Sequence, residues 1–294
     1  MNFAHLGMSR RTIVLGVAVF AGLVSAGIGA DAALDKLTPG VSRAFASAAD
    51  ATTGSIGTEP NRIALLVANS RYPDANAPLV QPVNDARALS TALRNDGFDV
   101  DLLEDANRDD IVHAVARLKD KVRSDTVVML YFGGFGVQAG GESYMIPVDA
   151  TIWNENDVRR EGISIESVLT EMKERGARAK LVVVDASRRN PYERRYRGYS
   201  RGLAPINASD NALVLSSAPP DKVLDDVNGK NSLLVTELLD NMNSSAGTAE
   251  KVFDRTRVNV ARATEGVQVP SVSSSLIEDI RLGSGPAHLS DRGS

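Results

Sequence analysis

Short apolar runs that alternate with amphipathic stretches constrain the fold of this 294-residue chain more than any other feature. Residues 63–68 and 126–132 are uncharged and largely apolar, which is typical of strands buried on both faces of a parallel sheet. Between them, Ala86, Leu89 and Leu93 share one helical face. Further strands are predicted at 98–103, 181–184 and 212–216, a hairpin at 144–148, and helices at 108–122, 165–175, 232–242 and 248–263. This order predicts an α/β fold in one domain, with a mostly parallel sheet and helices on both faces.

The turn chemistry around the first helix gives its expected ends. Asn84 is a good N-cap residue, and Gly97 is suited to closing the helix. Parallel sheets place their functional sites at the carboxyl ends of strands, so residues 133–136 and 185–187 are the two segments to examine. The first contains Gly134-x-Gly136-x-x-Ala139, a formal dinucleotide-binding pattern. No helix is predicted to follow it, so we expect a tight glycine turn between strand and hairpin instead.

The N-terminus has the pattern of a targeting segment. Two arginines at 10 and 11 precede the uncharged stretch 12–30, and a small-x-small site follows at 30–32. Residues 1–32 are therefore predicted to be a signal peptide, with a partial match to the twin-arginine type, and the protein to be exported to the periplasm or secreted. The alternative is an uncleaved membrane anchor at 12–30. We expect a flexible linker at 33–60, the folded domain at 61–283 and a disordered tail at 284–294.

Composition excludes several kinds of site. The chain has no cysteine, so it has no disulfide, no thiolate metal site and no cysteine nucleophile. His5, His113 and His288 are too scattered to suggest a metal cluster. The net charge of −4 lacks the basic excess of a nucleic-acid-binding protein. We expect no metal, no other cofactor and no nucleic-acid partner.

Six short runs, in order along the chain, resemble the bacterial caspase-like cysteine peptidases, relatives of the metacaspases. They are 83–87 (VNDAR), 131–138 (YFGGFGVQ), 144–149 (YMIPVD), 184–191 (VDASRRNP), 200–205 (SRGLAP) and 268–270 (QVP). The resemblance covers residues 62–282 and implies a caspase-like sheet with helices on both faces, which agrees with the fold expected from periodicity.

The residues at the catalytic positions differ from those that the resemblance implies. Family members carry Ser-Gly-His-Gly after the third strand and Asp-x-Cys-Arg after the fourth, and the His and Cys form the catalytic dyad. This chain has Phe135 and Ser187 at those two positions, which are 52 residues apart, close to the spacing of about 50 in caspases. A serine hydroxyl needs a base, and a phenylalanine cannot supply one. We therefore expect a catalytically inactive pseudopeptidase with Phe135 at the mouth of the cleft beside Ser187. The alternative is an unusual endopeptidase that cleaves after Arg or Lys with Ser187 as nucleophile.

The resemblance also implies a pocket for the residue before the scissile bond, which in metacaspase relatives is acidic and selects Arg or Lys. Asp85 and Asp185 match its carboxylates, and Gly133 replaces its serine, which predicts a roomier and less polar pocket. Gly134 and the backbone N–H of Ser187 match the oxyanion-hole region. The simpler interpretation makes Asp85 a helix-start acid and Asp185 a turn residue. The partner expected from the pocket is a polypeptide with an exposed Arg or Lys, and a membrane only if the N-terminal segment is uncleaved.

A basic run follows the second catalytic position. Residues 188–201 contain six arginines, interleaved with three tyrosines. Such a pattern can bind single-stranded nucleic acid, but an exported acidic protein rarely meets one. A solvated loop is the simpler interpretation. A sharper hypothesis is that one of these arginines folds back into the acidic pocket and occupies it.

Overall fold

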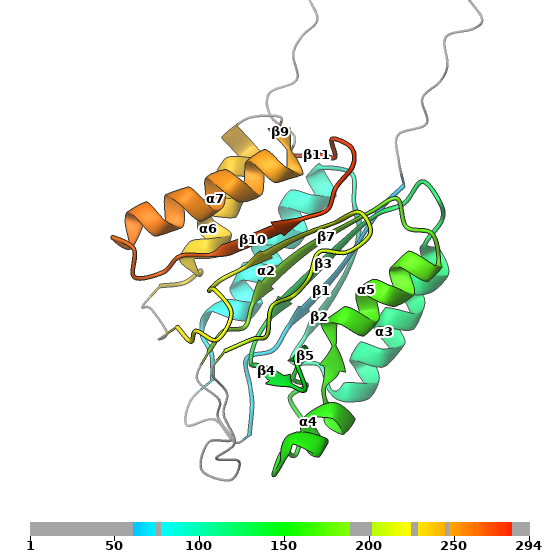
Figure 1. The fold of residues 1–294 in the computed structure, drawn as a ribbon, viewed down its shortest axis with the longest axis vertical. Coiled ribbons are helices and arrows are strands. Elements are labelled where there is room, and N and C mark those ends of the chain that lie inside the picture. Colours follow the sequence, from blue (N-terminus) through cyan, green and yellow to red (C-terminus); the bar gives the residue numbers. More distant parts are fainter. Residues whose placement is uncertain (1–60, 74–77, 189–201, 225–228, 245–246, 284–294) are drawn as a thin grey trace, which may run out of the picture. The chain divides into compact units, whose positions relative to one another are not determined.

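A six-stranded sheet in the order β10-β8-β7-β3-β1-β2 forms the centre of the domain (Figure 1). The computed structural model describes residues 61–73, 78–188, 202–224, 229–244 and 247–283. The strands of the sheet are β1 (Arg62–Ala68), β2 (Asp99–Glu104), β3 (Val127–Gly133), β7 (Ala179–Asp185), β8 (Ala212–Ser216) and β10 (Ser271–Ser274). Neighbouring strands are parallel except for β10, which pairs antiparallel with β8. The mostly parallel sheet expected from the sequence is confirmed.

Helices cover both faces of this sheet (Figure 1). The first face is covered by α2 (Gln81–Asn95), α6 (Leu233–Ser244) and α7 (Ala249–Ala263), and the second face by α3 (Arg108–Lys121) and α5 (Ile165–Glu174). Strand residues alternate between the two faces. On β3, Met129 and Tyr131 pack in the cluster of the first face, whereas Val128 and Leu130 pack in that of the second. The α/β fold class is therefore confirmed.

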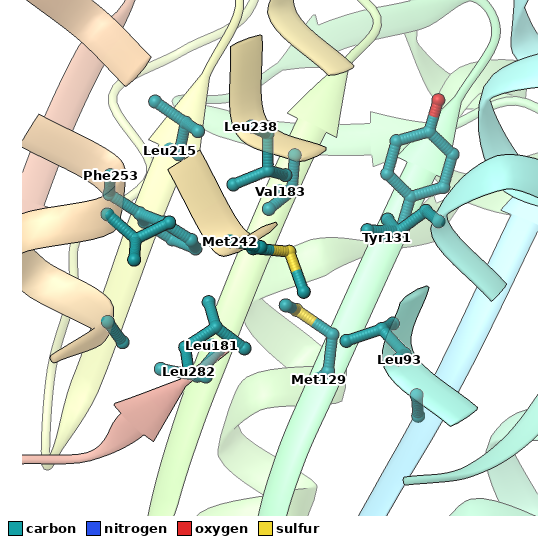
Figure 2. Packing of buried hydrophobic residues seen from close by; sticks show 14 of the residues in the cluster. Leu93, Met129, Tyr131, Leu181, Val183, Leu215, Leu238, Met242, Phe253 and Leu282 are labelled. Atoms are coloured by element: carbon teal, nitrogen blue, oxygen red, sulfur yellow. The ribbon is translucent and has the colours of Figure 1, made fainter. Parts of the chain in front are cut away.

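The core of the first face holds large apolar side chains from α2, α6, α7 and the central strands (Figure 2). Leu89 and Leu93, which were predicted to share the inner face of α2, are fully buried. Each such leucine contributes about 1.5–3 kcal/mol by leaving water. The Tyr131 hydroxyl is the polar end of this otherwise apolar cluster (Figure 2).

The start of α2 differs from the expectation. The helix begins at Gln81, three residues before Asn84, because Pro82 is suited to the first helical turn. Asn84 lies inside the helix, where its side-chain amide donates to the carbonyls of Val80 and Lys230. The prediction of an Asn84 cap was therefore wrong, whereas the helix does end before Gly97, whose φ of +84° favours glycine.

A small three-stranded sheet follows β3. It comprises β4 (Gly136–Ala139), β5 (Glu142–Met145) and β6 (Ile163–Ser164), and α4 (Glu155–Glu161) lies beside it. The chain bends at Gly134 between β3 and β4, as predicted for the glycines before the hairpin, and a second glycine turn lies at 140–141 inside the β4-β5 hairpin. A strand and not a helix follows Gly136, as expected against a dinucleotide site. The short strands β9 (Gly247–Thr248) and β11 (Arg281–Leu282) pair with each other.

Several predictions fall outside the described residues. They are the signal peptide at 1–32, the linker at 33–60, the tail at 284–294 and the basic run beyond Arg188, and each stays a prediction. Among the described residues, no helix has the length and apolar character needed to cross a membrane.

Candidate functional site

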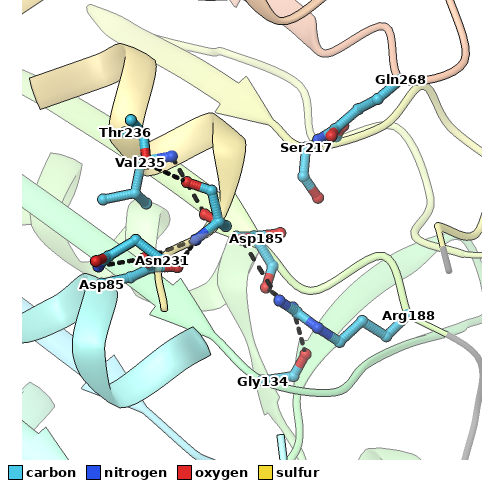
Figure 3. Close-up of polar contacts among 10 residues, drawn as sticks. Asp85, Gly134, Asp185, Arg188, Ser217, Asn231, Val235, Thr236 and Gln268 are labelled. Atoms are coloured by element: carbon cyan, nitrogen blue, oxygen red, sulfur yellow. Dashed lines mark hydrogen bonds and ion pairs between the residues drawn. The ribbon is translucent and has the colours of Figure 1, made fainter. Parts of the chain in front are cut away.

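The carboxyl ends of β3, β7 and β8 bring several predicted site residues to one edge of the sheet. Gly133 ends β3 directly opposite Asp185, which ends β7. Ser217 follows β8, and its N–H donates to the carbonyl of Val184. In strand alternation, Tyr131, Gly133 and Asp185 belong to the first face, which α2 covers. Asp85 of α2 is therefore held over this edge (Figure 3).

Asp85 is fully buried between α2 and the start of α6. Its Oδ1 accepts hydrogen bonds from Asn231 Nδ2 at 2.8 Å and from the Ser232 N–H at 3.0 Å. Burial, followed by the charge of Asp185, raises the pKa of Asp85 from 3.8 to about 6, and these hydrogen bonds oppose that rise. The simpler interpretation, an acid in the first turn of its own helix, does not hold, because Asp85 instead anchors the N-terminus of α6.

Asp185 is also buried, and a guanidinium lies against it (Figure 3). Arg188 Nη2 is 3.5 Å from Asp185 Oδ2. Arg188 Nη1 donates to the backbone carbonyl of Asp185, and to that of Gly134 at 3.3 Å. Both side chains are less than one-tenth exposed. The structure therefore places Arg188, the first arginine of the basic run, against Asp185, and its occupation of a substrate pocket stays a prediction.

Gly133 does not leave the pocket as open as predicted. A Cβ atom at position 133 would lie 2.5 Å from the Tyr131 hydroxyl oxygen and 3.2 Å from Cβ of Pro82. The space beside Gly133 is therefore occupied by the phenol, and the polarity expected to be lost with the family's serine is supplied by Tyr131. Burial, and then the charges of Asp85 and Asp185, raise the pKa of Tyr131 well above its ordinary value, so the phenol stays neutral.

Phe135 and Ser187, the two residues predicted to stand at the catalytic positions, lie close to this edge. Phe135 is buried, and its ring packs edge-on against Tyr72 with a centroid distance of 4.7 Å. Its backbone N–H donates a hydrogen bond to the Tyr72 hydroxyl oxygen at 3.1 Å. The ring is thus part of the apolar cluster beneath the β4-β5 hairpin. The prediction that it also borders Ser187 and excludes water there stays a prediction.

Ser187 is only 2 % exposed, and its carbonyl accepts the N–H of Leu224 at 2.7 Å. Residue 224 also forms an isolated bridge with Arg188, so the chain after β8 runs beside Ser187 and Arg188. The Gly134 N–H donates to the Asp185 carbonyl at 3.3 Å. That predicted oxyanion donor is therefore engaged with the backbone in this arrangement.

A general base for Ser187 would have to come from elsewhere in the chain. Within the described residues, the single histidine is His113, which is exposed on α3 and therefore lies on the second face of the sheet. No group of three His, Cys, Asp or Glu side chains in that part of the chain is arranged to hold a metal ion. The described site thus offers carboxylates, a guanidinium and hydroxyls, and it lacks the imidazole and thiol of the family's dyad.

Sequence reasoning missed three residues of this site: Tyr131, Asn231 and Ser232. Tyr131 had a detectable signal, because it lies two residues before Gly133 in a strand and so belongs to the same face. Ser232 also had one, since a serine directly before an apolar helix is a favoured N-cap. Nothing in the sequence indicated that the acceptor for this helix start would be Asp85, some 147 residues earlier.

Comparisons with known proteins agree with the fold. The family model for the caspase domain (Peptidase C14) matches residues 61–281. Among curated proteins, the human mucosa-associated lymphoid tissue lymphoma translocation protein 1 and its mouse homolog are each 30 % identical over 138 residues. That region is 45 % of this chain and 16 % of either relative, so the match spans about a sixth of their length. Because the caspase-domain model matches most of its length, this chain belongs to the caspase-domain family.

Proposed function

We propose that this protein does not cleave peptides and that it binds a polypeptide by holding an Arg or Lys side chain between Asp85 and Asp185. The observation that carries the proposal is the meeting of two buried carboxylates, from α2 and β7, beside catalytic positions that hold Phe135 and Ser187. The carboxylates with which the family recognises a basic side chain are kept at this edge, whereas the His and Cys that cleave the peptide are replaced.

The absence of cleavage is argued from the catalytic positions. A serine nucleophile needs a base within about 2.6–3.2 Å that takes its proton, and Phe135 has no lone pair for that purpose. Loss of a nucleophile or its base lowers turnover by about 10⁶ in a serine peptidase. Turnover reduced by that factor is too slow for peptide cleavage to be the function of this site.

The preference for a cation is argued from charge. Two carboxylates that share a buried site repel each other, and a cation between them relieves the repulsion and donates charge-assisted hydrogen bonds. Arg188 already places a guanidinium against Asp185 at this edge, so a group of this shape fits there. A partner's basic side chain would share Asp185 with Arg188, and the competition between the two cations limits the affinity.

Export is part of the same proposal. The basic pair at 10 and 11, the uncharged stretch 12–30 and the small-x-small site favour a cleaved signal and a mature chain that begins near Ala33. The partner is then a polypeptide met outside the cytoplasm. N-terminal sequencing of the native protein tests this part, and an intact Met1 in a cytosolic fraction would contradict it.

The test of binding without cleavage uses the mature protein, a Ser187→Ala variant and a Phe135→His/Ser187→Cys double variant. Each is assayed on fluorogenic peptides that end in Arg or Lys before the reporter. We expect no turnover by the wild-type protein and measurable turnover only by the double variant. Cleavage by the wild-type protein that Ser187→Ala abolishes would refute the proposal and establish the alternative, a serine endopeptidase.

A further inference from the structure

The Tyr131 hydroxyl is a buried polar group that the fold does not use. Its side chain is fully buried, and the hydroxyl has no hydrogen-bond partner within the described residues. A buried hydroxyl without a partner costs a protein about 1–3 kcal/mol by the usual measure. A phenylalanine would fill the same apolar cluster without that cost (Figure 2). The hydroxyl therefore needs an explanation outside the packing of the core.

The position of this hydroxyl points to the acidic pocket. Its oxygen lies beside Gly133, which pairs with Asp185 at the ends of β3 and β7. The charges of Asp85, Asp185 and Arg188 act on the phenol. It also takes the space that a side chain at Gly133 would fill, 2.5 Å from a Cβ at that position. The phenol can therefore reach the pocket only because residue 133 has no side chain.

The guanidinium already present does not satisfy this hydroxyl. Arg188 directs its hydrogen bonds at the carbonyls of Gly134 and Asp185 and at the Asp185 carboxylate, and the Tyr131 oxygen stays unpaired in the described chain. Burial, and then the charge of Asp185, raise the pKa of Asp85 to about 6, although Asn231 and Ser232 donate hydrogen bonds to its carboxylate. The Tyr131 hydroxyl of β3 therefore lies unpaired among the described residues beside the Asp85 carboxylate of α2, where a further donor group can bond to both.

We propose that Tyr131 is a specificity-determining residue of this pocket, whose hydroxyl accepts a hydrogen bond from the charged nitrogen of a basic side chain inserted between Asp85 and Asp185. The inference rests on the proposed function and names the third recognition group of that site. A guanidinium has five donors in a planar fork, so it can reach both carboxylates and the phenol at once, whereas an ammonium has three. Arg is therefore preferred over Lys.

The test compares wild-type protein with Tyr131→Phe by calorimetry, using blocked pentapeptides whose central residue is Arg, Lys, citrulline or Ala. Citrulline keeps the shape of Arg and lacks its charge. A hydrogen bond to a charged group corresponds to about a ten- to hundredfold change in affinity. We expect Tyr131→Phe to weaken binding of the Arg peptide by that factor, to narrow the Arg-over-Lys preference, and to leave the melting temperature unchanged or higher.

Tyr144→Phe is the matched control, because the Tyr144 hydroxyl is bonded to Glu142 at 3.1 Å on β5. It removes the same atom from another largely buried tyrosine and should not alter peptide affinity. Gly133→Ala is the second variant, since its Cβ displaces the phenol without removing the hydroxyl. We expect it to weaken Arg binding as well.

The outcomes separate this inference from the proposed function. If wild-type protein binds the Arg and citrulline peptides equally, the proposed function fails. If wild-type protein prefers Arg and Tyr131→Phe binds it with unchanged affinity, the inference about Tyr131 fails alone. A fall of several degrees in the melting temperature of Tyr131→Phe would also overturn it, because the hydroxyl would then have a structural partner such as a bound water.

Discussion

Replacing Asp85 with asparagine should stabilise this protein at neutral pH and have almost no effect at pH 4. The folded state holds a proton on Asp85 up to a pKa of about 6, whereas the ordinary value is 3.8. Between these values the folded state binds more protons than the unfolded state, so stability falls as the pH rises through this window. Above about pH 6 the buried charge of Asp85 lowers the stability of the folded state by its full amount, and below pH 3.8 this loss of stability vanishes.

The size of the effect follows from the shift. At about 1.36 kcal/mol per pKa unit, the rise corresponds to about 3 kcal/mol. For a domain of this length, that is about 6–12 °C in melting temperature. The amide oxygen of Asp85→Asn can replace Oδ1, which accepts the shorter bonds from Asn231 and Ser232, so that only the 3.2 Å bond from Ser232 to Oδ2 is lost. The anchor of α6 is therefore kept while the buried charge is removed.

Urea unfolding of both proteins at pH 4, 5, 6 and 7 measures this difference. Asp240→Asn, an exposed carboxylate on the same helix α6, controls for the loss of one negative charge. If Asp85→Asn is less stable than wild type at pH 7, the hydrogen bonds to α6 outweigh burial, and the reasoning from burial and charge repulsion is refuted. A difference that does not change between pH 4 and pH 7 would refute it equally.

Two further substitutions test the charges at either end of β7. Arg188→Gln leaves Asp185 buried without its guanidinium, so the free energy of unfolding in urea should fall by about 3 kcal/mol, as for other broken buried ion pairs. An unchanged urea midpoint would mean that the pair is not formed in solution. Lys180 is buried near the start of the strand, where it donates to the Asp210 carbonyl, and burial lowers its pKa. Wild-type stability should therefore rise as the pH approaches 10.5, the ordinary pKa of lysine. Lys180→Met should abolish that rise, measured as the urea midpoints at pH 8 and 10. The same pH dependence in both proteins would show that Lys180 does not cause it.

The sheet and its helices were predictable because their signals are local. Residues 212–216 are a strand with the predicted bounds, and α5 ends one residue before the predicted limit. The edge strand β10 was missed, since its sequence, SVSS, has only one apolar residue and is paired on one side. Helix α4 was missed although Asn154 and Asp157 form a capping box at its start.

The site was predictable in part and for a different reason. No periodicity indicated that Asp85 and Asp185 belong together, and only the resemblance to caspase-like proteins joined them. Their contacts could not be read from the sequence, because Asn231 and Arg188 reach them through the packing of α6 and the path of the chain after β7. Long-range partners of buried charges depend on tertiary structure, whereas strand and helix periodicity does not.

The unsatisfied polar groups of the described chain are not spread evenly over the fold. The buried hydroxyls without a partner there belong to Ser70, Tyr131 and Ser217, and all three lie at or just beyond the carboxyl ends of parallel strands β1, β3 and β8. Asp85, with its raised pKa, faces the same edge. At the amino ends, by contrast, a polar group such as Arg178 is fully paired, in a two-bond contact with Glu278. A fold selected for stability alone would remove such costs one substitution at a time. Their concentration at one edge therefore supports our proposal that this edge serves for binding.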